Sequence, residues 1–153
     1  MYKQCWLLQY YFLTYYDLEQ KQSYILCGQA SCGHKDSSCS AKYDRMDDVK
    51  GLAGYKNYVY AFIWNKEIGA YEFVQMNMFG EERKIITTIP IGNYIENEWI
   101  TESIGNDIVY CGNMVWFDIT KSFITEKDVS TGYQSINQQL GIDLNTGEML
   151  ENL

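Results

Sequence analysis

The sequence predicts an all-β protein built from antiparallel meanders, and three observations carry this prediction. The 153-residue chain has 14 Tyr, 6 Phe and 4 Trp but a single Pro, a composition rich in residues that favour strands. Most apolar segments are short runs broken by turn residues. No segment shows a convincing helical period. With 46% hydrophobic and 21% charged residues, the chain can bury a core and is not disordered.

The first expected hairpin lies near the N-terminus. A Tyr-rich run over residues 10–16 ends at Asp17, and a second run over residues 23–27 follows a polar turn. Before them, residues 1–8 mix one Lys with apolar and amide side chains, and no small-residue cleavage site follows. This is a poor secretory signal, so the sequence taken literally indicates a cytoplasmic protein. The alternative, that the chain is a trimmed or truncated form of an exported protein, stays open.

Two further groups of strands are expected along the chain. Three runs closed by Pro90, which cannot donate to a strand ladder, form a meander over residues 58–64, 71–78 and 84–89. A later group covers residues 99–104, 108–111, 114–119, 138–144 and 148–153. We expect a loop or insertion at 121–135, a short turn within 44–52, and a buried, inert thiol at Cys111.

A weak internal repeat favours a partial β-propeller of about three blades. A motif of an apolar residue, Asp or Asn, and another apolar residue recurs at positions 16–18, 76–78, 117–119 and 142–144. Any all-β protein can show such residues at hairpin ends, because their side chains stabilise turns, so a β-sandwich is the alternative. Since propellers close with four to eight blades, residues 1–153 form either one all-β domain, a propeller fragment or a homo-oligomer.

The charge balance excludes several classes of protein. A formal net charge of −8 argues against nucleic-acid binding, which depends on Lys and Arg. The single His excludes catalytic centres that need several histidines. No run approaches the 18 apolar residues of a membrane span, so none is expected.

The most distinctive segment gathers three of the five Cys and the only His within residues 27–39. It spells Cys-x4-Cys-x-His-x4-Cys, with Cys27, Cys32, His34 and Cys39 as candidate metal ligands. Three thiolates and one imidazole make a complete tetrahedral set for Zn²⁺. Because four protein ligands leave no open position, the expected cofactor is one structural zinc ion that staples the loop at 27–41.

The spacing leaves other interpretations open. A single residue separates Cys32 from His34, so joint ligation requires a bend, which we expect at Gly33. The main rival is a disulfide, either Cys27 with Cys39 or Cys32 with Cys39, which export would favour. Three ordinary thiols beside a surface His are the remaining alternative.

The segments Ile25-Leu26-Cys27, Cys32-Gly33-His34 and Cys39-Ser40-Ala41 follow a Tyr-rich hairpin. In this they resemble uncharacterised β-propeller-like proteins of anaerobic Gram-positive bacteria, mostly exported lipoproteins. The resemblance implies a propeller-like fold and an extracytoplasmic location, and it implies no reaction. This chain departs from the group in having no evident signal and in being much shorter than a closed propeller.

Other chemistry has weaker support in the sequence. Paired acids at 47–48, 81–82 and at Glu96 with Glu98 could serve a hydrolase only if two of them faced one cleft. No nucleophile elbow, phosphate loop or calcium loop is present. We therefore expect a non-enzymatic binding or scaffold module at a cell surface, with a protein, peptide or glycan ligand. The alternatives are a carbohydrate or peptide hydrolase, and a thiol-based metal or redox sensor.

Overall fold

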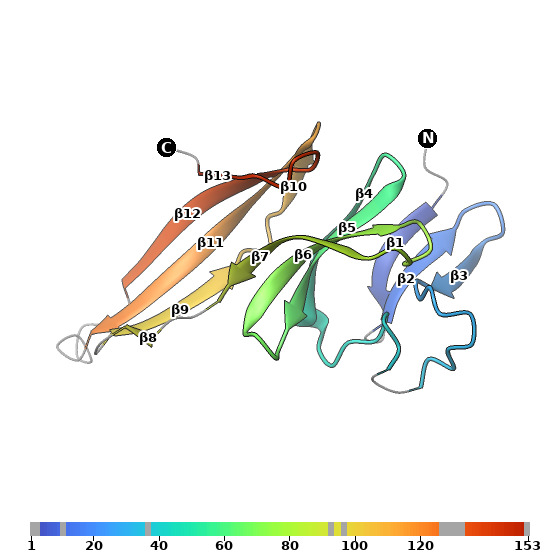
Figure 1. The fold of residues 1–153 in the computed structure, drawn as a ribbon, viewed down its shortest axis with the longest axis horizontal. Coiled ribbons are helices and arrows are strands. Elements are labelled where there is room, and N and C mark those ends of the chain that lie inside the picture. The colour runs from blue at the N-terminus through green and yellow to red at the C-terminus, as the bar shows by residue number, and fades with distance from the viewer. Residues whose placement is uncertain are drawn as a thin grey trace. The chain divides into compact units, whose positions relative to one another are not determined.

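The structure is a computed structural model that describes residues 4–9, 12–35, 38–91, 94–95, 98–125 and 134–151. In these residues the strands form three antiparallel sheets, and the helical structure amounts to one short 3-10 helix, η1 (Met46–Asp48) (Figure 1). The prediction of an all-β protein is confirmed. Contacts divide the chain into two compact units, Met1–Trp64 with Glu72–Ile86, and Asn65–Tyr71 with Thr87–Leu153. None of the helical structure in the described ranges is long or apolar enough to cross a membrane.

The first sheet has three strands in chain order, β1 (Gln4–Gln9), β2 (Phe12–Asp17) and β3 (Gln22–Ile25). The hairpin expected near the N-terminus is the β2–β3 pair, and β1 is a strand that the sequence patterns did not indicate. Tyr15 and Tyr24 lie opposite each other in this hairpin, and their stacked rings have centroids 5.2 Å apart. Such cross-strand aromatic pairs stabilise the hairpin and fix its register.

The second sheet is the expected meander with one more strand at its start. Its order is β4 (Val49–Tyr55), β5 (Tyr58–Asn65), β6 (Ala70–Asn77) and β7 (Lys84–Pro90), and Pro90 ends it as predicted. Alternate residues of β5 and β6 join Leu13 and Leu26 in one buried cluster. Its members from this sheet are Val49, Val59, Ala61, Ile63, Val74 and Met76.

The two central strands of this sheet are buried on both faces. The face opposite the cluster carries Tyr60, Phe62 and Phe73, each at most 2% exposed. The ring of Phe73 lies 4.6 Å from that of Phe62 and 5.8 Å from that of Tyr60, between centroids. The aromatic residues thus serve as core packing at these positions.

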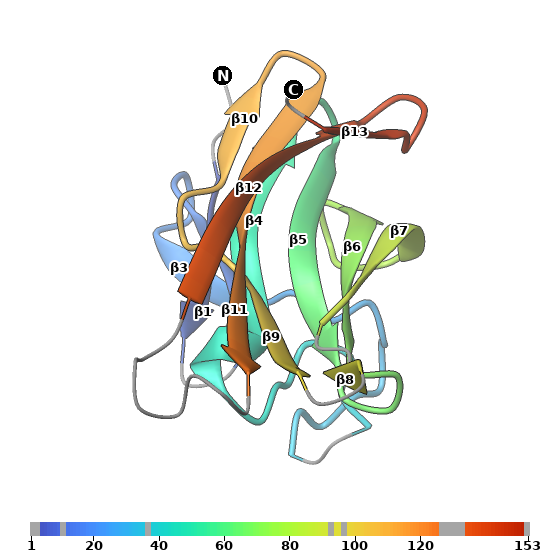
Figure 2. The same cartoon turned by 90° about the vertical axis from the view of Figure 1, so that its left-hand side faces the viewer.

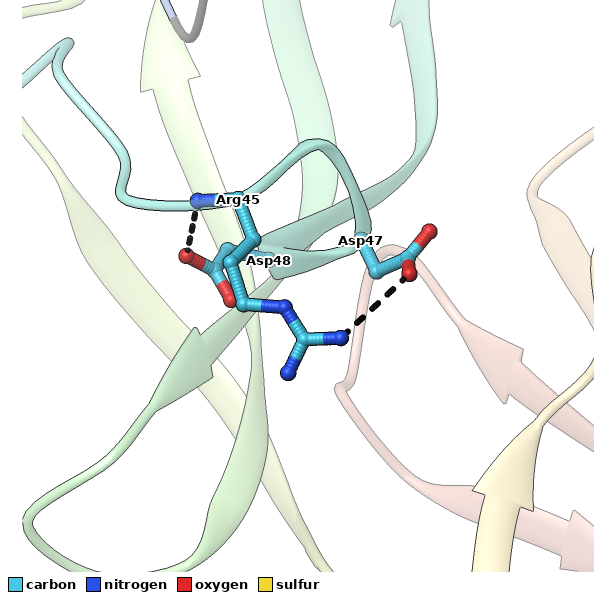
Figure 3. A network of polar contacts seen from close by, with 3 residues as sticks. All are labelled: Arg45, Asp47 and Asp48. Atoms are coloured by element: carbon cyan, nitrogen blue, oxygen red, sulfur yellow. Dashed lines mark hydrogen bonds and ion pairs between the residues drawn. The ribbon is translucent and has the colours of Figure 1, made fainter.

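A short turn precedes β4, in the region where the sequence indicated one. The Arg45 amide donates to the Asp48 carboxylate at 2.9 Å, and the Arg45 guanidinium lies 3.8 Å from the Asp47 carboxylate (Figure 3). The ion pair with Asp47 is largely exposed, so it adds little to stability. The bond to Asp48 instead shapes the backbone that leads into the second sheet.

The third sheet lies in the second unit. Its order is β13-β12-β11-β9-β8, and β10 pairs with β11 outside this path. The strands are β8 (Tyr94–Ile95), β9 (Glu98–Ile104), β10 (Val109–Cys111), β11 (Met114–Thr125), β12 (Gln134–Asp143) and β13 (Met149–Glu151). Figure 2 shows β11 and β12 side by side as the longest pair of this sheet. Its buried face is formed by Ile104, Val115, Phe117, Ile119, Leu140 and Ile142.

Two expectations for this sheet were wrong. The predicted loop at 121–135 holds the end of β11 and the start of β12, while residues 126–133 lie outside the described residues. Lys121 of β11 lies opposite Glu102 of β9 and forms an ion pair of 3.1 Å with it, so a polar stretch here is a paired strand. Cys111 is exposed rather than buried, because β10 pairs with β11 alone and turns that side chain outward.

Gly141 gives a testable prediction for the β11–β12 pair. It lies directly opposite Trp116, and a Cβ at this position would lie 2.7 Å from the indole ring. We expect Gly141→Ala to displace the ring and to cost about 1–3 kcal/mol, the usual range for overpacking. Chemical denaturation followed by tryptophan fluorescence measures both effects, and unchanged stability would contradict the prediction.

Three of the four repeated apolar-Asx-apolar motifs mark equivalent positions. Asp17, Asn77 and Asp143 each end a strand, and the side-chain oxygen of each accepts two backbone amides of the following turn. Each of these turns leads into the last strand at an edge of its sheet, namely β3, β7 or β13. Asp118 differs, because it lies in the middle of β11.

Candidate metal centre

The candidate metal ligands lie on a long loop that begins after β3 (Figure 1). Both ends of this loop are bound to one residue of β2. The Leu26 amide donates to the Leu13 carbonyl at 2.8 Å, and the Leu13 amide donates to the Ala41 carbonyl at 2.8 Å. All three side chains are fully buried in the cluster of the first unit. The loop therefore starts and ends at fixed points of the core.

Hydrogen bonds within the loop shape its course between these points. The Cys32 amide donates to the Gln29 carbonyl at 3.0 Å, and the Lys42 amide donates to the Cys39 carbonyl at 3.1 Å. The Lys42 ammonium reaches back to the Lys35 carbonyl at 2.8 Å. These bonds form turns beside three of the four candidate ligands.

The structure brings all four predicted ligands together. One ligand atom each from Cys27, Cys32, His34 and Cys39 lies within 4.8 Å of the others. Cys39 is 2% exposed and belongs to the core, whereas the other three are half-buried. The three cysteines are free thiols in the structure, so neither of the disulfides weighed from the sequence is formed. These four residues could hold a metal ion such as zinc.

A bend at His34 makes the close spacing of Cys32 and His34 workable. His34 has φ of +53°, in the left-handed region that few residues other than glycine adopt. The sequence indicated a bend at Gly33, and the positive φ falls instead on the next residue. The Nδ1 atom of His34 lies 3.4 Å from the Cys39 Sγ. Strained backbone of this kind is typical of functional sites, where the surrounding structure maintains it.

The thiols differ in their surroundings. Partial burial acts to raise the pKa of the Cys27 thiol, but the Gln29 amide, the Ser40 hydroxyl and the two neighbouring thiols outweigh it and lower the pKa to about 6. The Ser40 Oγ lies 3.6 Å from the Cys27 Sγ. Burial raises the pKa of Cys39 to about 11, and the adjacent thiols add to this rise against the Ala41 amide. Hydrogen bonds to a thiolate of this kind help to orient a metal ligand.

The turn between β6 and β7 packs closely against the start of the loop. Gly80, with φ of +83°, leaves no space for a side chain, since a Cβ there would overlap the Leu26 carbonyl oxygen and lie 2.7 Å from its carbon. Gly28 is equally confined, because a Cβ there would overlap the Glu81 side chain and lie 3.0 Å from the Glu81 Cα. Backbone packing on both sides of Cys27 thus fixes the position of the first ligand.

The end of the loop is bound to the same turn through Tyr43. The Tyr43 hydroxyl donates to the Ser40 carbonyl at 3.3 Å and accepts a bond of 3.2 Å from Nη1 of Arg83. Burial raises the pKa of Tyr43, the Arg83 guanidinium lowers it, and the neighbouring Cys39 and Asp48 raise it further. Tyr43, Ser40 and Arg83 were not identified from the sequence as parts of the site.

The surface above the cluster is open. A hollow of about 490 Å³ is lined by residues 29–35 and Ser38, so Cys32 and His34 border it. This hollow provides a path by which an ion can reach the ligands, as a metal site requires.

The paired acids considered from the sequence do not converge in the described part of the chain. Glu81 and Glu82 are exposed beside the β6–β7 turn, and Asp47 and Asp48 are bound to Arg45. Glu96 and the side chain of Glu98 lie outside the described residues. Comparison of the chain with protein-family models, curated proteins and solved structures finds no match.

Proposed function

We propose that the protein is a non-enzymatic binding or scaffold module of β-propeller type, in which one structural Zn²⁺ holds the loop at 27–41. The observation that carries this proposal is the convergence of Cys27, Cys32, His34 and Cys39 within 4.8 Å. Four protein ligands complete the tetrahedral shell of zinc and leave no position for substrate, which favours a structural role over a catalytic one. Thiolate and imidazole ligands also favour zinc over magnesium or calcium.

The environment of the cluster supports a structural role. Cys39 lies in the core of the first unit, and both ends of the loop are bound to Leu13. The loop itself contributes few buried apolar side chains between these ends, so a metal ion would supply the stabilisation that it lacks. When bound, zinc would provide the positive charge that holds three thiolates close together.

The propeller part of the proposal is supported by a turn that the three sheets share. Each sheet carries the same Asx turn before an edge strand, at Asp17, Asn77 and Asp143. Propeller blades are four-stranded antiparallel sheets, and the second sheet is a meander of this size. The resemblance to exported propeller-like proteins supports a cell-surface location, with a protein, peptide or glycan as ligand.

A thiol-based sensor is a second candidate, because Cys27 and Cys32 are half-buried thiols close to each other and Cys32 borders the open hollow. In such a sensor two thiols would form one disulfide, giving two electrons and two protons to hydrogen peroxide, which is reduced to two molecules of water. The sensor predicts that peroxide releases bound zinc reversibly, whereas a purely structural site resists it.

Native mass spectrometry tests the zinc site. We expect the reduced protein to carry one zinc ion per chain and to lose it with a strong chelator. A metal-free protein lighter by two hydrogens would instead indicate a disulfide and would contradict the proposal. The same spectra report the oligomeric state, which tests whether copies of the chain associate. Cys111→Ser is the control, because it removes an exposed cysteine outside the cluster and should leave zinc binding unchanged.

A further inference from the structure

Arg83 has an unusual environment in the first unit. Its Nη2 atom is buried and has no hydrogen-bond partner among the described residues. Its Nε donates to the Gly80 carbonyl at 3.3 Å, and its Nη1 donates to the Tyr43 hydroxyl at 3.2 Å. Buried polar groups are nearly always paired, so an unpaired guanidinium nitrogen requires an explanation.

The two partners of Arg83 connect it to both ends of the cysteine loop. Gly80 packs against Leu26, the residue before Cys27. Tyr43 donates to the Ser40 carbonyl, and Ser40 follows Cys39. The guanidinium is therefore connected to Cys27 through Gly80 and Leu26, and to Cys39 through Tyr43 and Ser40.

The net charge of the zinc-bound site explains why a cationic side chain near the cluster would be favourable. Three thiolates outweigh the two positive charges of Zn²⁺, so the complete site would carry one net negative charge. Partly buried charge is costly unless an opposite charge compensates it. The lysines of the loop hold their charges at the surface, since Lys35 is exposed and the Lys42 ammonium makes an exposed contact. The guanidinium of Arg83, by contrast, has one buried nitrogen, Nη2.

We propose that Arg83 is a positioning residue for the metal site, where it supplies the counter-charge of the zinc–thiolate complex and links the two ends of the loop through Gly80 and Tyr43. This inference rests on the zinc site proposed above. It assigns a role in metal affinity to a residue far from the cluster in sequence.

A matched pair of substitutions separates charge from hydrogen bonding. Arg83→Gln keeps an N–H donor without the charge, and Arg83→Lys keeps both a donor and the charge. We expect Arg83→Gln to lower zinc affinity by about 10- to 100-fold, the range found for residues that support metal ligands. Arg83→Lys should retain most of the affinity. Lys84→Gln, which removes an exposed positive charge from the next residue, is the control and should have no effect.

Zinc affinity is measured by titration against a competing chelator, and the result distinguishes the possible failures. If the wild-type protein binds no zinc, the proposed zinc site is wrong. If the wild-type protein binds zinc and Arg83→Gln binds it equally well, the role of Arg83 is wrong. Equal losses in Arg83→Gln and Arg83→Lys would also contradict the counter-charge and would indicate a purely geometric contact.

A measurement on the wild-type chain avoids dependence on variants that fail to fold. The chain has two arginines, Arg45 and Arg83, so ¹⁵N-arginine labelling gives two side-chain Nε signals. We expect zinc to shift the Arg83 signal and to slow its exchange with water, and to leave the signal of exposed Arg45 unchanged. An Arg83 signal insensitive to saturating zinc would overturn the proposal.

Discussion

Replacing Cys32 with serine is expected to remove the stabilisation that zinc gives to the loop at 27–41, with little change in the metal-free protein. A ligand that binds only the folded state at 100 times its dissociation constant adds about 2.7 kcal/mol to the free energy of unfolding. Serine does not replace a thiolate ligand, so this gain is lost. Because Cys32 is half-buried, its substitution alone should cost little.

Hydrogen exchange measured with and without zinc checks this prediction. In the wild-type protein, zinc should slow the exchange of loop amides by roughly 100-fold where opening of the loop limits exchange. In Cys32→Ser, zinc should have no such effect, while the amides of the β11–β12 pair stay protected in both proteins. Cys111→Ser should behave as the wild-type protein. Loss of protection spread evenly over the chain would show that the metal site does not stabilise the loop alone.

Replacing Gly80 with alanine is expected to be among the most destabilising single changes in the first unit. An alanine in the left-handed region costs about 1–2 kcal/mol, and overpacking adds about 1–3 kcal/mol. The overpacking arises because the new Cβ would overlap the Leu26 carbonyl. Since Leu26 precedes Cys27, the substitution should also weaken zinc binding.

Gly69→Ala is the matched control. Gly69 lies in the β5–β6 turn next to the same sheet, has φ of +63°, and has no atom within 4 Å of a Cβ position. Gly69→Ala should therefore lower the free energy of unfolding only by the cost of alanine in the left-handed region, about 1–2 kcal/mol. Chemical denaturation measures both stabilities, and zinc competition measures both affinities. Equal losses of stability would mean that the contact between the β6–β7 turn and the loop contributes nothing.

The sequence predicted strands well where one face is apolar and failed where other features hide that pattern. The runs that became β5, β6 and β7 have long apolar stretches and clear turns. β4 was missed because Gly51, with φ of +60°, lies in an irregular pairing between Lys50 and Ala53 that interrupts the alternation. The exposed position of Cys111 depends on which strand β10 pairs with, and an apolar run alone does not reveal this.

The candidate site was predictable only in its local part. Four ligands within 13 residues give a visible spacing, and their convergence confirms that the segment could hold a metal ion. The residues that support them come from positions 13, 43 and 80–83, and their roles depend on packing between distant segments. No local pattern marks Arg83, whose neighbours in sequence are exposed or polar. The position of the bend, at His34 rather than Gly33, likewise depends on the surrounding hydrogen bonds.

The two hydrogen bonds of Leu13 have a consequence for protein engineering. Because one residue of β2 holds both Leu26 and Ala41, the two ends of the segment between them are fixed at one point of the sheet. A segment with its ends fixed in this way can be exchanged as a cassette. A short Gly-containing turn between Leu26 and Ala41 should close the gap and keep both bonds to Leu13. A transferable metal-binding tag would have to include Tyr43 and the β6–β7 turn as well, because these residues support the segment.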